Sequence, residues 1–191
     1  EEGFTFTMKQ AYLVHGWDGS PTNCWFPWLS KEVEKLGYKV KALKMPHPAT
    51  PTIKDWVSTL EKEIIPAEET ILIGHSIGCQ TIMRYLQKPP RKVKAVFFVA
   101  GWFHIDNEEE SKESKEIAKP WLETPMDFTK IKTNCTKFVA LFSNDDPFVP
   151  LSDAKLFEKN LGAKIIIEKN KSHYELQSTN STLLKEIKKA I

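Results

Sequence analysis

The residues Gly74-His75-Ser76-Ile77-Gly78 place a serine between two glycines, directly after the apolar run 71–73. A β-branched run, this motif and a helix-like segment together predict a strand, a tight turn and a helix, with the serine hydroxyl projecting from the turn. Glycines lack a Cβ atom, so the strand and the helix can approach closely. Free N–H groups at the helix start favour developing negative charge. Ser76 is therefore a candidate nucleophile; the alternative is a glycine-rich turn that exposes an idle serine.

A nucleophilic serine needs a base, and the base needs an orienting carboxylate. Asp145 and Asp146 follow the apolar run 137–142, and His173 follows the apolar run 163–167. His173 is the only histidine after this acidic pair. Serine, then aspartate, then histidine, each after a strand, is the chain order of the α/β-hydrolases. His173 is thus the candidate base, against the alternative of a surface loop histidine.

Two features of the acidic loop favour Asp146 over Asp145 as the orienting acid. Asn144-Asp145 is typical of a turn in which side chains bond to the local backbone. Pro147 restricts Asp146 to extended geometry, which suits a carboxylate directed at another loop. The alternative is that Asp146 only shapes the turn.

The loop after the first predicted strand is a dense turn signal, His15-Gly16-Trp17-Asp18-Gly19-Ser20-Pro21. We expect the negatively charged oxygen of an acyl-transfer intermediate to meet the backbone N–H of Ile77 and a second N–H from this loop, that of Trp17. We expect His15 and Gly16 to contact the substrate.

The segments that must position these residues alternate between strands and helices. Strands are predicted at residues 10–14, 38–43, 71–73, 93–100, 137–142 and 163–167. Helical periodicity lies between and after them, which indicates an α/β fold: one central parallel sheet of about six strands with helices on both faces and little or no lid. Residues 101–133 shift to a charged composition and predict a solvated helix or loop, with a small lid as the alternative.

Composition bounds the class of protein. The chain has 191 residues and a net charge of +2 with both signs interspersed, so we expect no nucleic acid and no membrane as partner. No stretch approaches the ~20 apolar residues of a membrane span. The three cysteines, Cys24, Cys79 and Cys135, have no metal-site spacing and predict free thiols in the cytoplasm. Residues 8–191 are expected to form a single domain, and residues 1–7 to be a cloning or processing remnant.

Four motifs together resemble the small serine hydrolases of the YdeN and retinoblastoma-binding protein nine family. They are His15-Gly16-Trp17, Gly74-His75-Ser76-Ile77-Gly78, Asp145-Asp146-Pro147-Phe148-Val149-Pro150 and Ser172-His173-Tyr174. The resemblance implies a compact α/β-hydrolase with Ser76 as nucleophile, Asp146 as acid and His173 as base. Many members have Gly-His-Phe around the base; the Ser-His-Tyr of this chain bears on the flexibility of that loop.

The implied chemistry is hydrolysis of a small carboxylic ester, thioester or amide through an acyl-enzyme, with no cofactor and no metal. A serine at the turn, where dehalogenases carry aspartate, argues against their chemistry. The second hypothesis is a catalytically idle scaffold that acts as a protein-binding module. The Leu-x-Cys-x-Glu pattern of pocket-protein binders is absent around all three cysteines, so no protein partner is predicted.

Overall fold

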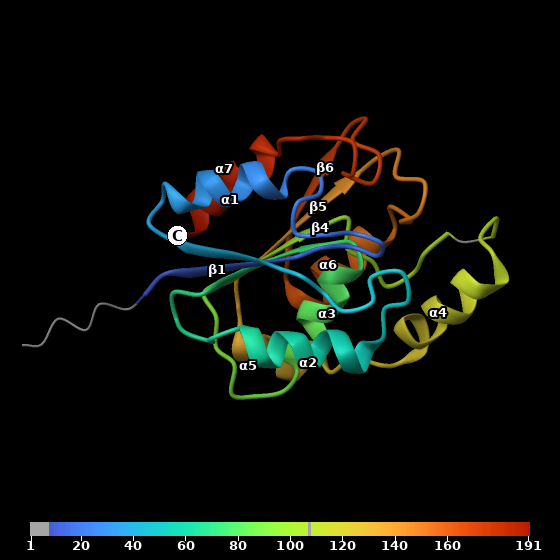
Figure 1. Ribbon diagram of the computed structural model, residues 1–191, viewed down its shortest axis with the longest axis horizontal. Coiled ribbons are helices and arrows are strands. Elements are labelled where there is room, and N and C mark those ends of the chain that lie inside the picture. Colours follow the sequence, from blue (N-terminus) through green and yellow to red (C-terminus); the bar gives the residue numbers. More distant parts are fainter. Residues whose placement is uncertain (1–7, 107) are drawn as a thin grey trace, which may run out of the picture.

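A computed structural model of the protein describes residues 8–106 and 108–191, and its centre is one parallel sheet with the strand order β2-β1-β3-β4-β5-β6 (Figure 1). The strands are β1 (Gln10–Val14), β2 (Lys39–Leu43), β3 (Ile71–His75), β4 (Ala95–Val99), β5 (Phe138–Ser143) and β6 (Lys164–Glu168). Every neighbouring pair is parallel. The predicted α/β class and strand number are confirmed. Residues 1–7, the expected remnant, lie outside the described residues.

Helices cover both faces of this sheet. They are α1 (Phe26–Glu34), α2 (Ile53–Glu63), α3 (Ile77–Leu86), α4 (Lys112–Glu123), α5 (Phe128–Asn134), α6 (Asp153–Leu161) and α7 (Ser181–Ala190). Helices α1 and α7 lie on one face, and α2, α3, α5 and α6 lie on the other (Figure 1). Two apolar clusters fill the layers, one with Leu29 and Ile187 against the first face and one with Trp56 and Ile82 against the second. Each fully buried large apolar side chain contributes about 1.5–3 kcal/mol to folding.

Burial along the strands follows from this cover. Every residue of β1, β3, β4 and β5 is buried, whereas the edge strands β2 and β6 expose part of their length. Val14 of β1 pairs with Gly74, and Gly74 pairs with Phe98 of β4, so the carboxyl ends of these strands are level. The loops that follow them therefore gather at one edge of the sheet, where ligands bind in parallel sheets.

The charged segment 101–133 contains helix α4 and most of helix α5, so the helical form of the prediction holds for these residues. Helix α4 begins after Ser111, whose hydroxyl accepts the Ser114 N–H, and it continues through Pro120. Only Ala118 and Trp121 of α4 are buried, and the helix extends beyond the end of the sheet (Figure 1). Among the described residues, no helix has the length and apolar character needed to cross a membrane.

Candidate active site

Ser76 lies on a strained turn between β3 and α3. Its backbone φ is 55° and ψ is −122°, a region that costs a non-glycine residue about 1–3 kcal/mol. The flanking glycines are required by space. A Cβ on Gly78 would come within 2.3 Å of the Val14 carbonyl oxygen, and one on Gly74 within 2.8 Å of the Cys79 nitrogen. The turn can therefore form only where both positions lack a side chain.

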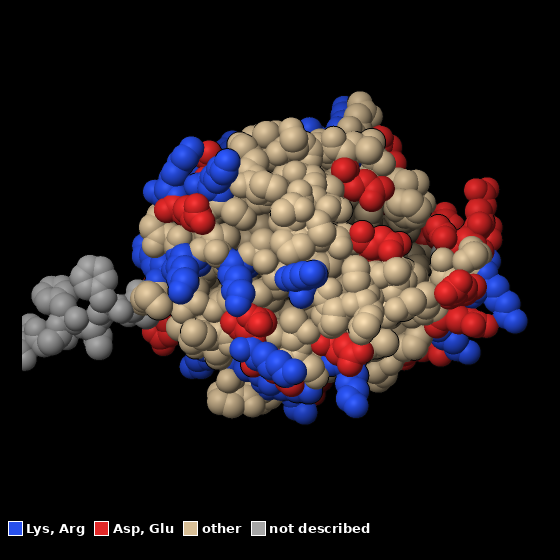
Figure 2. All heavy atoms as spheres, in the orientation of Figure 1, with Lys and Arg blue, Asp and Glu red and all other residues tan. Residues whose placement is uncertain are grey.

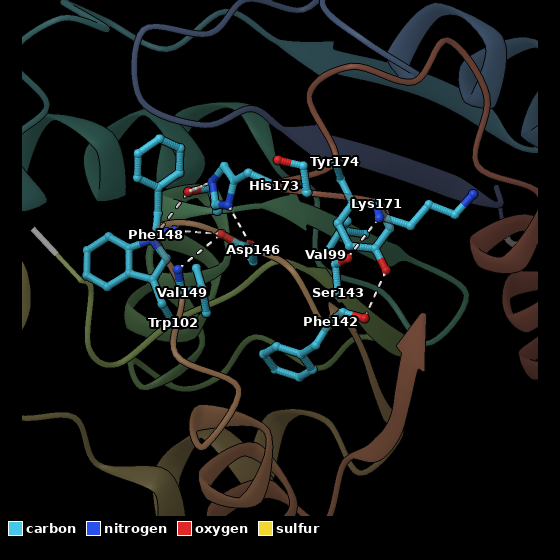
Figure 3. Close-up of polar contacts among 12 residues, drawn as sticks. Val99, Trp102, Phe142, Ser143, Asp146, Phe148, Val149, Lys171, His173 and Tyr174 are labelled. Carbon is cyan, nitrogen blue, oxygen red and sulfur yellow. Dashed lines mark hydrogen bonds and ion pairs between the residues drawn. The ribbon is translucent and has the colours of Figure 1, made fainter. Parts of the chain in front are cut away.

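An unbroken chain of hydrogen bonds joins Ser76, His173 and Asp146. His173 Nε2 lies 2.8 Å from Ser76 Oγ, and His173 Nδ1 lies 2.8 Å from Asp146 Oδ2; Figure 3 shows His173 and Asp146 facing each other. An ionised carboxylate can only accept, so Nδ1 carries the ring proton and Nε2 accepts from the serine hydroxyl. Ser76 and His173 are only 8% and 7% exposed, which keeps bulk water from competing for these bonds.

The two aspartates have different partners. Asp146 Oδ1 accepts the N–H groups of Phe148 and Val149 at 2.9 and 3.1 Å, which fixes the carboxylate that faces His173. Asp145 accepts the Ser143 hydroxyl at 2.6 Å and the Ser172 N–H at 2.9 Å. These bonds, that from Ser143 first, lower the pKa of Asp145. Asp145 therefore bonds to the Ser143 side chain within its own turn and ties that turn to the loop of His173. The local backbone N–H groups are bound by Asp146 and not, as predicted, by Asp145.

The loop that carries His173 is held through three consecutive backbone carbonyls, each of which accepts a side-chain donor from a distant part of the chain. The bonds run from His75 Nε2 to the His173 oxygen (2.7 Å), from Trp25 Nε1 to the Tyr174 oxygen (3.0 Å) and from Cys24 Sγ to the Glu175 oxygen (3.3 Å). Ser172 and Tyr174, which flank the histidine, both have positive φ, 50° and 58°. The Ser-His-Tyr sequence is thus fixed by contacts where a glycine would fit without strain.

His75 is a positioning residue that the sequence analysis did not identify. Its ring packs edge-on against Trp25, and its Nε2–H donates to the His173 carbonyl. Burial, followed by the nearby His173, lowers the pKa of His75 to about 3, so the ring is neutral at physiological pH. The signal available in the sequence was its place at the carboxyl end of a buried strand.

The loop after β1 lies against Ser76. A Cβ on Gly16 would stand 3.3 Å from the Ser76 Cβ. Within the described parts of the chain, the Trp17 backbone N–H donates to no other backbone group. The Ile77 N–H opens α3 and so has no partner within that helix. Both donors are available near Ser76, and their role at the oxyanion stays a prediction.

His15 is engaged by the protein itself. Its Nδ1 lies 2.8 Å from the Gly16 oxygen and its Nε2 accepts the Met45 N–H at 3.1 Å. Burial lowers the pKa of His15, which favours the neutral ring that this pairing requires. The expected contact of His15 with substrate stays a prediction, and it would involve the carbon edge of the ring.

A cavity of about 540 Å³ opens beside Ser76 and His173. One wall is the start of α4 and the residues before it, including Glu110, Glu113 and Ile117, so the charged segment borders the site and is more than a solvated helix. Of the described residues, five carboxylates line the cavity: Asp18, Asp106, Glu110, Glu113 and Glu175. None of the described lining residues is Lys or Arg, and Figure 2 shows acidic side chains gathered at this end of the molecule.

A second residue that the sequence analysis did not identify contacts Ser76 directly. The indole Nε1–H of Trp102 donates to Ser76 Oγ at 3.3 Å, and Figure 3 shows the indole beside His173. Trp102 follows β4 and is 2% exposed. Aromatic residues after buried strands are usually core residues, so its type alone gave no signal of this contact.

The parallel sheet, the serine on its turn and the histidine and carboxylate at the same edge define an α/β-hydrolase. The chain matches the serine hydrolase family over residues 11–188. It is 30% identical to the serine hydrolase RBBP9 of Rattus norvegicus over 169 residues, 87% of each chain. It is 29% identical to YdeN of Bacillus subtilis over 169 residues, 87% of this chain and 86% of YdeN.

The crystal structure of the B. subtilis ydeN gene product superposes with a TM-score of 0.85 at 26% identity, covering 96% of this chain and 98% of that one. The protein belongs to the serine hydrolase family. It is therefore a hydrolase enzyme, which leaves the idle scaffold without support.

Proposed function

We propose that this hydrolase cleaves small carboxylic esters, or the related thioesters or amides, with Ser76 as nucleophile, His173 as base and Asp146 as acid. The observation that carries this proposal is the hydrogen-bonded chain from Ser76 Oγ through both ring nitrogens of His173 to Asp146 Oδ2. Each donor in that chain meets an acceptor. A proton can thus leave the serine in the direction of the base without rearrangement.

In the proposed mechanism, His173 Nε2 takes the proton of Ser76 as Oγ bonds to the substrate carbonyl carbon. The negative charge on the carbonyl oxygen is met by the backbone N–H groups of Ile77 and Trp17. Asp146 holds the ring in the reactive tautomer and stabilises the imidazolium. His173 then gives its proton to the leaving group as the bond from that group to the carbonyl carbon breaks. Water, activated by His173, hydrolyses the acyl-enzyme.

The cavity supports a small substrate. Its volume of about 540 Å³ lies within the range of small-molecule sites, roughly 300–1,000 Å³. Gly16 and His15 line the same cavity as Ser76, consistent with their proposed contact with the substrate. The five lining carboxylates support neutral or cationic substrates over anionic ones, because like charge repels at a partly enclosed surface. The proposed reaction requires no metal and no cofactor.

We further propose that residues 8–191 act as one domain in the cytoplasm. All the described strands belong to one sheet, which supports a single folding unit. Cys24, Cys79 and Cys135 are free thiols, as expected of a reducing compartment.

Labelling by a fluorophosphonate probe, which modifies activated serines, tests the nucleophile. We expect the wild-type protein to be labelled at Ser76 and to hydrolyse p-nitrophenyl acetate, and we expect Ser76→Ala to lose both. Ser58 on α2 lies outside the cavity, so Ser58→Ala is the matched control and should behave as wild type. Labelling found by peptide mapping at Ser20 or Ser143 would refute the assignment. A panel of esters of increasing acyl length then identifies the substrate range.

A further inference from the structure

Trp102 contacts the reacting atom but has no place in the triad or the oxyanion site. Because the Ser76 hydroxyl donates to His173 Nε2, the indole N–H at 3.3 Å must donate to a lone pair of Ser76 Oγ. We propose that Trp102 is a further catalytic residue, whose indole N–H stabilises negative charge on Ser76 Oγ, and that the buried carboxylate of Asp153 positions it. This inference rests on the proposed role of Ser76.

The geometry of the hydroxyl oxygen explains what the indole can do. Oγ has four directions: one holds Cβ, one holds the proton shared with His173, and one lone pair accepts from Trp102. The remaining lone pair is left to attack the substrate, so the contact selects the direction of attack. Tryptophan is a hydrogen-bond donor only, and in the proposed step the indole keeps its proton. A donor fixed in advance in a site that excludes water is most effective where charge develops.

Charge develops on Oγ twice in each catalytic cycle. In acylation the proton passes from Oγ to His173 Nε2 while the bond from Oγ to the acyl carbon forms. In deacylation the same bond breaks, and Oγ takes a proton back from His173. The indole N–H faces Oγ in both steps, so its removal should slow acylation and deacylation alike.

The backbone around Trp102 is fixed on several sides. Ala100 has φ of 50°, which turns the chain sharply after β4. A Cβ on Gly101 would stand 2.8 Å from the ring of Phe157, so the loop lies close against α6. Gln80 Nε2 donates to the Trp102 carbonyl oxygen at 3.1 Å. The indole therefore reaches Ser76 from a rigid turn.

Asp153 fixes the two residues that follow. Its side chain is fully buried, and Oδ2 accepts the N–H groups of Phe103 at 2.6 Å and His104 at 2.8 Å, while Oδ1 lies 2.8 Å from His104 Nδ1. A buried carboxylate is costly unless its hydrogen bonds are complete. Within the described chain, the side-chain bonds of Asp153 go to the loop of Trp102. Asp153 itself opens α6 just after the loop of Asp146. It therefore connects the acid loop to the tryptophan loop.

Trp102→Phe removes the donor and keeps an aromatic ring in place. We expect kcat for p-nitrophenyl acetate and the rate of fluorophosphonate inactivation to fall about 10- to 100-fold, with KM within about threefold. The matched control is Trp121→Phe. Trp121 is equally buried, and its indole donates to the Pro51 carbonyl at 3.1 Å, away from Ser76. The control should keep kcat within about threefold at a similar melting temperature.

Asp153→Asn tests the positioning role. We expect it to lower kcat about fivefold or more in the wild-type background and less than about twofold in the Trp102→Phe background, because residues that act through one contact are not additive. An equal loss in both backgrounds would overturn the role of Asp153. Wild-type kcat in Trp102→Phe, or an equal loss in Trp121→Phe, would overturn the role of Trp102.

Two further outcomes keep the inference testable. If Trp102→Phe does not fold, Gln80→Met offers a second variant. It removes the Gln80 bonds to the Trp102 and Trp121 carbonyls and to Arg84 Nε, and it should lower kcat with little change in KM; an unchanged kcat would refute the inference. If Ser76→Ala keeps its activity, the proposed function fails together with this inference. If only the Trp102 variants behave as wild type, the function stands and the inference alone fails.

Discussion

Replacing Asp146 with asparagine should nearly abolish activity, because the ring proton of His173 would then lie on Nε2 instead of Nδ1. Asp146 accepts three donors, the N–H groups of Phe148 and Val149 at Oδ1 and the Nδ1–H of His173 at Oδ2. Asparagine has one oxygen and one NH₂ group, so it cannot accept on both sides. Its orientation decides which donors lose their partner.

The contacts favour one orientation. With the amide oxygen toward the backbone, both N–H bonds survive and the NH₂ group faces His173. The opposite orientation leaves two N–H donors facing an NH₂ group, in a side chain that is 3% exposed. Each unsatisfied buried donor costs about 1–3 kcal/mol. The first orientation leaves roughly one fewer donor unsatisfied, so it is lower in free energy by about that amount. His173 must then present a lone pair at Nδ1, which moves its proton to Nε2, where it can no longer accept from Ser76.

A histidine held in that tautomer lowers kcat about 10⁴-fold in serine proteases, and we expect a loss of similar size here. The matched control is Asp145→Asn. Its amide oxygen can still accept from Ser143 and Ser172 while its NH₂ group meets solvent, so kcat should stay within about tenfold of wild type. The assay is kcat on p-nitrophenyl acetate, with melting temperatures to show that both variants fold. A larger loss in Asp145→Asn than in Asp146→Asn, at unchanged melting temperatures, would mean that Asp145 is the acid.

Two further predictions concern pH and charge. Burial lowers the pKa of His75 to about 3. Below about pH 6.5, His75 therefore binds a proton in the unfolded chain but stays neutral in the folded chain. The free energy of unfolding should therefore decrease as the pH falls, by up to about 1.4 kcal/mol per pH unit from this group. Between about pH 6 and about pH 4, the urea midpoint of His75→Gln should decrease less steeply with falling pH than that of the wild-type protein. Equal slopes in the two proteins would contradict this account. Reversing charge with Glu110→Lys and Glu113→Lys together should raise kcat/KM for an anionic ester relative to a cationic one about fivefold at low salt, and the gain should shrink in high salt. Glu116→Lys, on the same helix as Glu113 but outside the cavity lining, is the control, and an equal effect there would refute the role of the lining carboxylates.

The fold was largely predictable because its buried strands are short apolar runs separated by turn residues. Helix α4 was harder to predict, because only Ala118 and Trp121 of it are buried. Its many charged residues leave no clear apolar face in the sequence. What holds it is Arg84 of α3, whose buried guanidinium donates to the Trp121 and Thr124 carbonyls. Burial lowers the pKa of Arg84 to about 10. An arginine in a sequence indicates a surface residue, so this link could not be predicted.

The site divides in the same way. Ser76 could be proposed from a motif of five residues, and His173 from its position after the acidic pair along the chain. Both signals can be read directly from the sequence. Trp102, His75 and Asp153 matter through bonds to residues far away in the sequence, and such bonds leave no spacing to detect. One general rule would have drawn attention to two of them: His75 ends a buried parallel strand and Trp102 lies just beyond another, at the edge where ligands bind.

The three carbonyl bonds that hold the His173 loop also set an order of events during synthesis. Their donors precede their acceptors by 98, 149 and 151 residues, and contacts of such separation form late because a long loop must close first. A nascent chain can complete β1, β3 and the serine turn while the histidine is still inside the ribosome. It would carry the strained Ser76 without His173, the proposed base. If His173 is the base, as proposed, a chain that stops before β6 and the loop after it should lack hydrolytic activity even where β1, β3 and the serine turn have folded.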